Sequence, residues 1–174
     1  AVAAPVEAGM RVLIHAAAGG AGSIAVQIAK MRGAWVAATC SSRNADFVRG
    51  LGADQVVAYD TEAFEDRLSD LDLVFDVMGG AVHAKSYRVL RRGGALVCLN
   101  AEPFEDRSAE YGVRLVRPVI EADPTALADL VAAVADGRVR PVVETVFPFS
   151  EFAAAQRHNE SGHARGKVVV EIVP

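Results

Sequence analysis

A glycine-rich stretch lies between an apolar run and a helical segment, and it constrains the fold more than any other part of the chain. Residues 11–15 read Arg-Val-Leu-Ile-His, residues 16–22 read Ala-Ala-Ala-Gly-Gly-Ala-Gly, and residues 23–32 have the apolar spacing of a helix. A strand, a tight turn and a helix in direct succession form the arrangement that holds the pyrophosphate of a dinucleotide. The stretch therefore predicts an α/β fold with a nucleotide site at this turn.

The glycines of this turn have separate physical roles. Gly19 and Gly20 allow backbone angles that a side chain would forbid, and they let the main chain approach a ligand closely. Gly22 lets the helix pack tightly against the strand. The N–H groups of the first helical turn then point at the loop, where the helix dipole favours an anion. Similar Ala/Gly-rich turns also occur in parallel sheets that bind no ligand, so the turn alone leaves that alternative open.

Composition and charge limit the class of protein. The chain has 174 residues, enough for one domain with its own core, and its 52% hydrophobic content is typical of a parallel sheet covered on both faces by helices. The net charge is −4 at pH 7 and no Lys/Arg block occurs, which argues against a nucleic-acid partner. No apolar run is long enough to span a bilayer, so no membrane partner is expected.

The two cysteines and the first residues give further expectations. Cys40 and Cys98 lie in apolar strand-like runs, and neither has a Cys or His neighbour at metal-ligand spacing, so no metal site is predicted. A reduced, cytoplasmic protein is the simplest interpretation. The chain begins at Ala1 without a methionine and leads straight into a strand, as in the middle of a longer polypeptide. We therefore expect a fragment or an excised domain.

Apolar strand-like runs and helical segments alternate along most of the chain. This alternation is the sequence form of a doubly wound parallel sheet of the Rossmann type, here with about six strands. Pro118 indicates an edge strand or a strand end, and Asp123-Pro124 opens the helix that follows. We expect strands at 11–16, 34–40, 55–59, 71–77, 95–100 and 113–120, helices at 21–32, 44–51, from 61, at 81–91 and 124–136, and a loop at 101–111.

The pattern changes after residue 141. A strand over 142–147, a helix near 150–159 and a strand over 167–173 form a strand-helix-strand coda. The sequence therefore divides into a dinucleotide-binding domain over 1–141 and a C-terminal return segment over 142–174.

The end of the second expected strand decides which nucleotide the site favours. In a dinucleotide-binding fold, an Asp or Glu at this place accepts a hydrogen bond from the ribose 2′-hydroxyl of NAD and repels the 2′-phosphate of NADP. This chain has Cys-Ser-Ser-Arg-Asn at 40–44 and no carboxylate before Asp46. Hydroxyl, amide and guanidinium groups suit a phosphate, since Arg binds it through two hydrogen bonds. NADPH is therefore the predicted cofactor, while a helix N-cap at Ser41 or Ser42 explains the same residues.

Several motifs in combination resemble a known family. They are residues 12–22 with 25–30, residues 51–57 with Tyr59, and residues 75–80, 90–94 and 161–169. In this order they resemble the cofactor-binding domain of the zinc-independent medium-chain dehydrogenase/reductases, in the branch of the NADPH:quinone oxidoreductases and enoyl reductases. The likeness covers essentially the whole chain, and the combination is more specific than any single motif.

The resemblance implies an NADPH site along the ends of the strands. It implies backbone contacts at the glycine turn, a 2′-phosphate site at the end of the second strand and an adenine near Tyr59. Some family members carry a lysine in place of Asn44, so the phosphate contact here relies more on Arg43. Residues after the fourth and fifth strands would line the nicotinamide half. The candidate cofactor-binding residues are Ala18, Gly19, Gly20, Ala21, Gly22, Ser41, Ser42, Arg43, Asn44, Tyr59, Met78, Gly79, Leu99 and Asn100.

The resemblance also implies hydride transfer to a quinone or an activated carbon–carbon double bond. Family enzymes begin with a separate catalytic domain that this chain lacks, so we expect cofactor binding with little or no turnover, and we name no catalytic residue. We expect His15 to be a packed or hydrogen-bonded residue and Asp76 to cap a backbone amide. The coda would pack on the absent domain, and homodimer contacts are expected at the edge of 167–173 or of 113–120.

Three alternatives remain open at this point. One is an enoyl-reductase module of a multidomain synthase, which would differ in its carrier-bound substrate. Another is the cofactor domain of a zinc-dependent alcohol dehydrogenase, whose metal ligands would lie in the absent domain. The third is a non-enzymatic NADPH-binding protein that keeps the fold without the chemistry.

Overall fold

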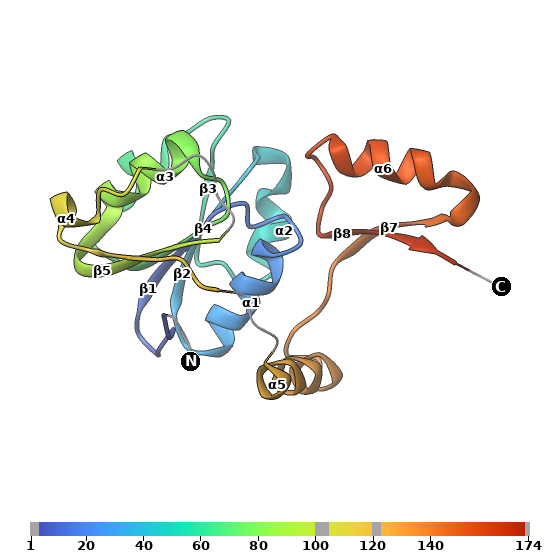
Figure 1. Cartoon of the computed structure of the whole chain (residues 1–174), viewed down its shortest axis with the longest axis horizontal. Helices are drawn as coiled ribbons and strands as arrows, with labels where there is room; N and C mark the ends of the chain where they lie inside the picture. Colours follow the sequence, from blue (N-terminus) through green and yellow to red (C-terminus); the bar gives the residue numbers. More distant parts are fainter. Residues whose placement is uncertain (1–3, 100–104, 120–122, 173–174) are drawn as a thin grey trace.

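The main part of the molecule is a six-stranded parallel sheet with helices on both faces (Figure 1). The computed structural model describes residues 4–99, 105–119 and 123–172. The strand order β3-β2-β1-β4-β5-β6 reverses direction between β1 and β4, which confirms the doubly wound topology. The strands are β1 (Arg11–Ile14), β2 (Trp35–Cys40), β3 (Gln55–Ala58), β4 (Leu71–Asp76), β5 (Leu90–Cys98) and β6 (Arg114–Val116), and the helices are α1 (Gly22–Met31), α2 (Ala45–Gly50), α3 (Gly80–Ser86), α4 (Ser108–Tyr111) and α5 (Pro124–Ala135).

The sheet is buried on both faces because consecutive residues of a strand point to opposite sides. In β1, Val12 and Ile14 pack with Val26 of α1 in one apolar cluster. Leu13, between them, packs in a second cluster with Tyr87, which follows α3. The two clusters explain why the central strands are apolar nearly throughout.

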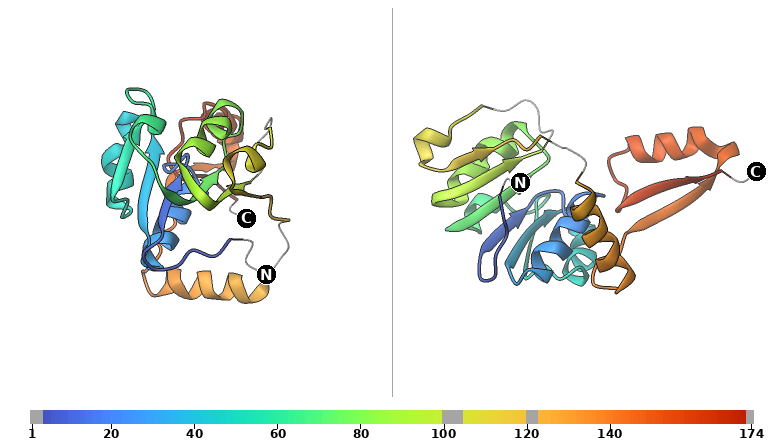
Figure 2. Two further views of the ribbon diagram at one scale, coloured as in Figure 1. Left: turned by 90° about the vertical axis from the view of Figure 1, so that its left-hand side faces the viewer. Right: turned by 60° about the horizontal axis from the view of Figure 1, so that its bottom comes forward.

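The coda forms a small second sheet. Strands β7 (Val143–Pro148) and β8 (Lys167–Glu171) pair in parallel, and α6 (Phe152–Glu160) connects them. This unit projects from the sheet domain in Figure 1 and in the right-hand view of Figure 2. Its base is fixed to the domain, since the N–H of Gly166 donates to the carbonyl of Ala18 at 2.8 Å. The return segment therefore borders the glycine turn.

The helix predicted from Thr61 is wrong. The structure has a loop there with a single 3₁₀ turn at Phe64–Asp66, and the hydroxyl of Thr61 donates to the carbonyl of Ala58 at 3.2 Å instead of capping a helix. Phe64 and Leu68, whose four-residue spacing is typical of a helix face, are both buried in the core from this irregular segment. The burial of Phe64 and Leu68 therefore gives the sequence the apolar spacing of a helix although the backbone forms a loop.

The predicted start of the fifth strand is also wrong. Helix α3 ends at Ser86, and a 3₁₀ turn at Tyr87–Val89 leads directly into β5, which begins at Leu90. The register of β5 against β4 shifts near its start. A Cβ atom at Gly94 would lie 2.9 Å from the carbonyl oxygen of Arg91 and 3.1 Å from that of Asp72. Gly94 thus lies within β5 at an irregular strand pairing, and the helix predicted over 81–91 ends early, at Ser86.

Two local predictions are confirmed. The Asp123 carboxylate caps α5 by accepting from the N–H groups of Thr125 at 3.0 Å and Ala126 at 3.1 Å, with Pro124 in the first turn. Strand β6 lies at the edge of the sheet, as Pro118 indicates. The last residues of two predicted strands, Asn100 and Ile120, lie outside the described residues, and so does the predicted cofactor contact of Asn100.

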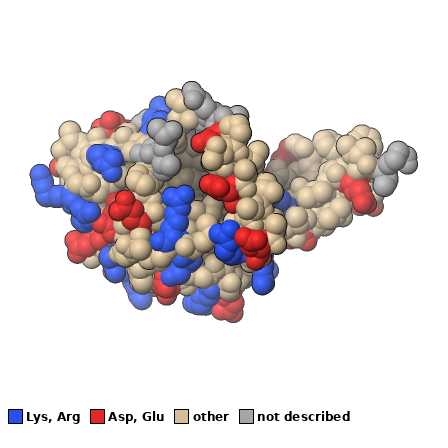
Figure 3. Space-filling model, turned by 90° about the horizontal axis from the view of Figure 1, so that it is seen from below, with Lys and Arg blue, Asp and Glu red and all other residues tan. Residues whose placement is uncertain are grey.

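The surface charges on one face of the molecule are mixed. On the face shown in Figure 3, Lys and Arg are interspersed with Asp and Glu, and neither sign gathers in one patch. None of the helices in the described part of the chain has the length and apolarity that crossing a membrane requires.

Candidate functional site

A cavity of about 660 Å³ lies where β1 to β4 end and where the coda returns. Ligands of open parallel sheets bind at this carboxyl edge, near the point where the strand order reverses. Gly162 and His163 of the coda also border the cavity. Of the predicted cofactor-binding residues, the cavity brings together Ala18, Gly19, Ser41, Arg43, Asn44, Tyr59 and Met78.

The glycine turn forms one wall of this cavity. The N–H of Gly19 donates to the carbonyl of Ala16 at 2.9 Å, and Ala16 has the left-handed backbone angle φ of 50°. A Cβ atom at Gly22 would collide with the Ala16 carbonyl. Only a glycine therefore lets α1 begin this close to β1, as the motif predicts.

The first turn of α1 is open to an anion. No side chain caps this helix end, and no acidic residue lies in its first turn. The N–H groups of Gly20, Ala21 and Gly22 belong to this end of the helix, although these three residues do not line the cavity itself. Backbone donors and the helix dipole therefore favour a phosphate here.

Lys167 lies at the glycine turn, although it does not line the cavity itself, and sequence reasoning missed it. A Cβ atom at Gly20 would collide with the Lys167 side chain, so this side chain lies directly over the glycine turn. Lys167 begins β8, far from the turn in sequence, and only the docking of the coda brings the two together. Its place at the start of the last strand gave no signal in the sequence.

The polar residues after β2 are only in part free to bind a ligand. Asn44 is buried, its amide donates to Ser41 Oγ at 3.2 Å, and its Oδ1 accepts from Arg165 Nε at 3.2 Å. Ser42 donates its N–H and its hydroxyl to Asp60. The expected N-cap at Ser41 or Ser42 is wrong, because neither side chain caps the 3₁₀ turn at Ser42–Asn44 or helix α2. Both serines instead take part in contacts that shape the cavity rim.

Arg43 and Ser41 face the cavity at this rim. Arg43 is exposed, and its Nη2 donates to the carbonyl of His163 at 3.3 Å. This contact links the second strand end to the coda. The guanidinium is therefore held beside the cavity, where it can bind a phosphate.

Of the residues expected around the nicotinamide, some line the cavity and others do not. Met78 lines the same cavity as Ser41 and Tyr59, and Met78 and Tyr59 are 52% and 62% exposed. Gly79 and Leu99 do not line this cavity. The structure thus brings Met78 to the residues expected at the adenine and the 2′-phosphate.

His15 lies at the base of the cavity in a fixed neutral state. Its Nδ1 is 2.9 Å from Thr39 Oγ1 and its Nε2 is 3.0 Å from Ser86 Oγ. The Ser86 hydroxyl donates to the carbonyl of Val82, so it accepts from the Nε2–H of His15. Burial lowers the pKa of His15 to about 4, and the charge of Asp76 opposes this only in part. His15 is a hydrogen-bonded residue of the core, as predicted.

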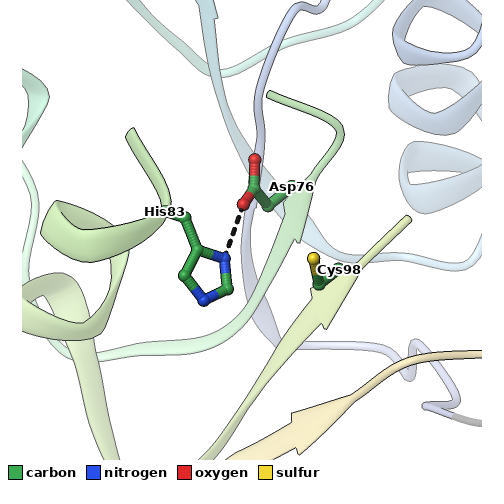
Figure 4. A group of neighbouring side chains, drawn as sticks. All are labelled: Asp76, His83 and Cys98. Atoms are coloured by element: carbon green, nitrogen blue, oxygen red, sulfur yellow. Dashed lines mark hydrogen bonds and ion pairs between the residues drawn. The ribbon is translucent and has the colours of Figure 1, made fainter. Parts of the chain in front are cut away.

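Asp76 confirms its expected capping role and joins a buried group. Its Oδ1 accepts from the N–H groups of Met78 at 2.8 Å and Gly79 at 3.2 Å. Its Oδ2 lies 2.8 Å from Nδ1 of His83, as Figure 4 shows. Cys98 pairs in register with Asp76. Its sulfur lies within 4.8 Å of an Asp76 carboxylate oxygen and of a His83 ring nitrogen.

Asp76, His83 and Cys98 are residue types that can bind a metal ion. They come from three elements, β4, α3 and β5, so the spacing along the sequence could not reveal the group. The His83 Nε2 lies 3.1 Å from the Tyr87 hydroxyl, and both Asp76 oxygens accept hydrogen bonds. The contacts therefore hold α3 against the end of β4 by hydrogen bonding.

The comparisons with known proteins show the family to which the chain belongs. The family model described as zinc-binding dehydrogenase matches residues 51–170. The chain belongs to this family, and the resemblance to the cofactor domain of the medium-chain dehydrogenase/reductases is confirmed. A solved structure of the quinone oxidoreductase from Coxiella burnetii has a TM-score of 0.89 and 33% sequence identity, over 97% of this chain and 54% of that one.

Two curated relatives match nearly the whole chain. The Arabidopsis thaliana protein named NADPH-dependent alkenal/one oxidoreductase, chloroplastic, is 37% identical over 171 residues, which are 96% of this chain and 42% of that protein. The Mus musculus protein named NAD(P)H oxidoreductase RTN4IP1, mitochondrial, is 33% identical over 192 residues, which are 95% of this chain and 48% of that protein. The chain therefore spans about half the length of the curated relatives it matches.

Proposed function

We propose that this chain is the NADPH-binding domain of a reductase that transfers hydride to a quinone or to an activated carbon–carbon double bond. The observation that carries the proposal is the glycine turn at the open end of α1, bordering a cavity whose rim holds Arg43. The named activities of the Arabidopsis and Coxiella proteins support the substrate class of quinones, enones or enoyl compounds.

The residues present fit such a dinucleotide. A cavity of about 660 Å³ is of the size that binds small molecules and cofactors. Phe64, Ala81 and Val82 give it apolar surface suited to a base. Glu65 also lines the cavity, and its Oε2 is buried without a hydrogen-bond partner among the described residues. Burial is the largest single influence and raises the pKa of Glu65, but the hydrogen bond from Lys85, a backbone hydrogen bond and the charges of Lys85 and Arg88 together lower it.

Each part of the site has one task. The bound cofactor supplies the hydride. The backbone of residues 18–22 and the start of α1 hold its pyrophosphate, and Ser41 with Arg43 holds its 2′-phosphate. Tyr59 and Met78 cover the adenosine half, while Gly79, Leu99 and Asn100 remain proposed neighbours of the nicotinamide.

The wider organisation belongs to the same proposal. Residues 1–141 form the dinucleotide-binding domain, and residues 142–174 return toward a catalytic domain that supplies the substrate pocket, so that this chain alone binds cofactor with little turnover. We place the activity in the zinc-independent branch, because the Ala-Ala-Ala-Gly-Gly turn and the Ser-Ser-Arg stretch favour it. The proposed assembly is a homodimer, and the two buried cysteines support a reducing, cytoplasmic location.

A calorimetric titration of this chain with NADPH and NADH tests the proposal. Arg43→Ala is expected to weaken NADPH binding about ten-fold or more, because it removes a charge-assisted hydrogen bond to the 2′-phosphate, and to leave NADH nearly unchanged. Asp136→Asn, far from the cavity, serves as the control. Absence of binding of either cofactor to the unmodified chain contradicts the proposal.

The alternatives are separated by substrate. A panel of quinones, enones, carrier-bound enoyl thioesters and alcohols, assayed with a longer polypeptide that contains the catalytic domain, distinguishes the reductase from an enoyl-reductase module and from a zinc-dependent alcohol dehydrogenase. Turnover of quinones or enones supports the proposal. No turnover with any substrate supports the non-enzymatic NADPH-binding protein.

A further inference from the structure

Asp60, just beyond the end of β3, places a carboxylate at the expected 2′-phosphate site. Its Oδ1 and Oδ2 accept from the N–H of Ser42 at 2.9 and 3.1 Å, and Oδ2 also accepts from the Ser42 hydroxyl at 2.7 Å. Asp60 lines the cavity and is exposed, so a ligand can reach it. The donors of Ser42 are therefore already bound to an acid.

The sheet register explains how the two residues meet. Strands β2 and β3 run in parallel with Cys40 opposite Ala58, and the N–H of Tyr59 donates to the Cys40 carbonyl at 3.0 Å. Ser42 and Asp60 each lie two residues beyond this last pair, so they are level with one another. A carboxylate at the end of β3 thus occupies the region where a dinucleotide fold can place one at the end of β2.

Arg43 and Asp60 place opposite charges at this rim of the cavity. The hydrogen bond from the Ser42 hydroxyl lowers the pKa of Asp60, and the nearby Arg43 guanidinium contributes in the same direction. Asp60 is therefore ionised at neutral pH. A 2′-phosphate beside it gains from Arg43 and loses from Asp60, whereas a 2′-hydroxyl can donate to the carboxylate.

We propose that Asp60 is a specificity-determining residue that narrows the preference for NADPH and lets the domain accept NADH as well. This inference rests on the proposed function, because it concerns the same nucleotide site. In it, Arg43 favours the phosphorylated cofactor, and Asp60 favours the cofactor with a free 2′-hydroxyl. The balance of these two side chains sets the ratio of the two affinities.

The test is a titration of the unmodified chain, Asp60→Asn and Asp60→Ala with NADPH and with NADH at low and moderate salt. Asp60→Asn keeps the side-chain size and removes the charge, so NADPH binding is expected to strengthen about five- to ten-fold. NADH binding is expected to weaken about two- to five-fold, since a charged acceptor is replaced by a neutral one. Asp60→Ala is expected to change the ratio in the same direction.

A matched control separates local from general effects of charge. Asp136→Asn removes one carboxylate from the exposed end of α5, outside the cavity, and is expected to change neither affinity. If Asp60 acts only by positioning Ser42, both Asp60 variants weaken NADPH, and the inference is overturned while the proposed function stands. If neither cofactor binds the unmodified chain or the control, both are overturned.

Discussion

At the scale of single residues, the surroundings of His15 fix its protonation state and create a dependence of stability on pH. Burial lowers the pKa of His15 from 6.5 to about 4. Between these values the unfolded chain binds a proton that the folded chain does not, so the free energy of unfolding falls as the pH drops below 6.5. From pH 7.5 to pH 5, we expect this group to remove about 2 kcal/mol.

Urea unfolding of the unmodified chain and of His15→Gln at several pH values measures this contribution. The glutamine keeps polar atoms near Thr39 and Ser86 but does not titrate in this range, so its free energy of unfolding is expected to fall less toward pH 5. Exposed His163→Gln is the control and is expected to follow the unmodified chain. Equal pH profiles for all three proteins contradict the assigned state of His15.

At the scale of elements, the coda brings Lys167 of β8 to the glycine turn beside α1. The pyrophosphate is common to both cofactors, so we expect a cation over Gly20 to stabilise bound NADPH and NADH alike. Lys167→Met is expected to weaken both about five- to ten-fold, without changing their ratio, when measured by calorimetric titration. Arg43→Ala, which changes the ratio, is the comparison. Unchanged binding of both cofactors to Lys167→Met argues against a role of the coda in the site.

The elements also show what the sequence alone can predict. The glycine turn, the alternation of strands and helices and the start of α5 at Asp123-Pro124 depend on neighbouring residues, and the sequence predicts them. Lys167 and Asp60 reach the site through the docking of β8 and the register of β2 with β3, which no local pattern encodes. The false helix at Thr61 has the same cause, because the core buries Phe64 and Leu68 from a loop.

At the scale of the whole molecule, the projecting coda carries apolar surface that the sheet domain does not cover. Phe149 and Phe152 are 61% and 53% exposed, with ring centroids 6.3 Å apart, and Val146 nearby in sequence is 54% exposed. Contiguous apolar surface of this kind marks an interface. For this chain on its own, we expect the coda to form the homodimer contact, in preference to the edge strand β6.

Sedimentation velocity over a range of concentrations tests this choice of surface. The unmodified chain is expected to dimerise, and the double variant Phe149→Ser, Phe152→Ser is expected to weaken the dimer about ten-fold or more, because each exposed phenyl ring loses the free energy of its burial. Leu127→Ser with Val131→Ser on α5 is the matched control, since these side chains are 62% and 59% exposed on another element. If the Leu127→Ser, Val131→Ser variant is monomeric, the interface lies on α5 and the choice of the coda is wrong. A dimer that survives both pairs of substitutions contradicts a contact through Phe149 and Phe152 and leaves the edges of β6 and β8 as the proposed surfaces.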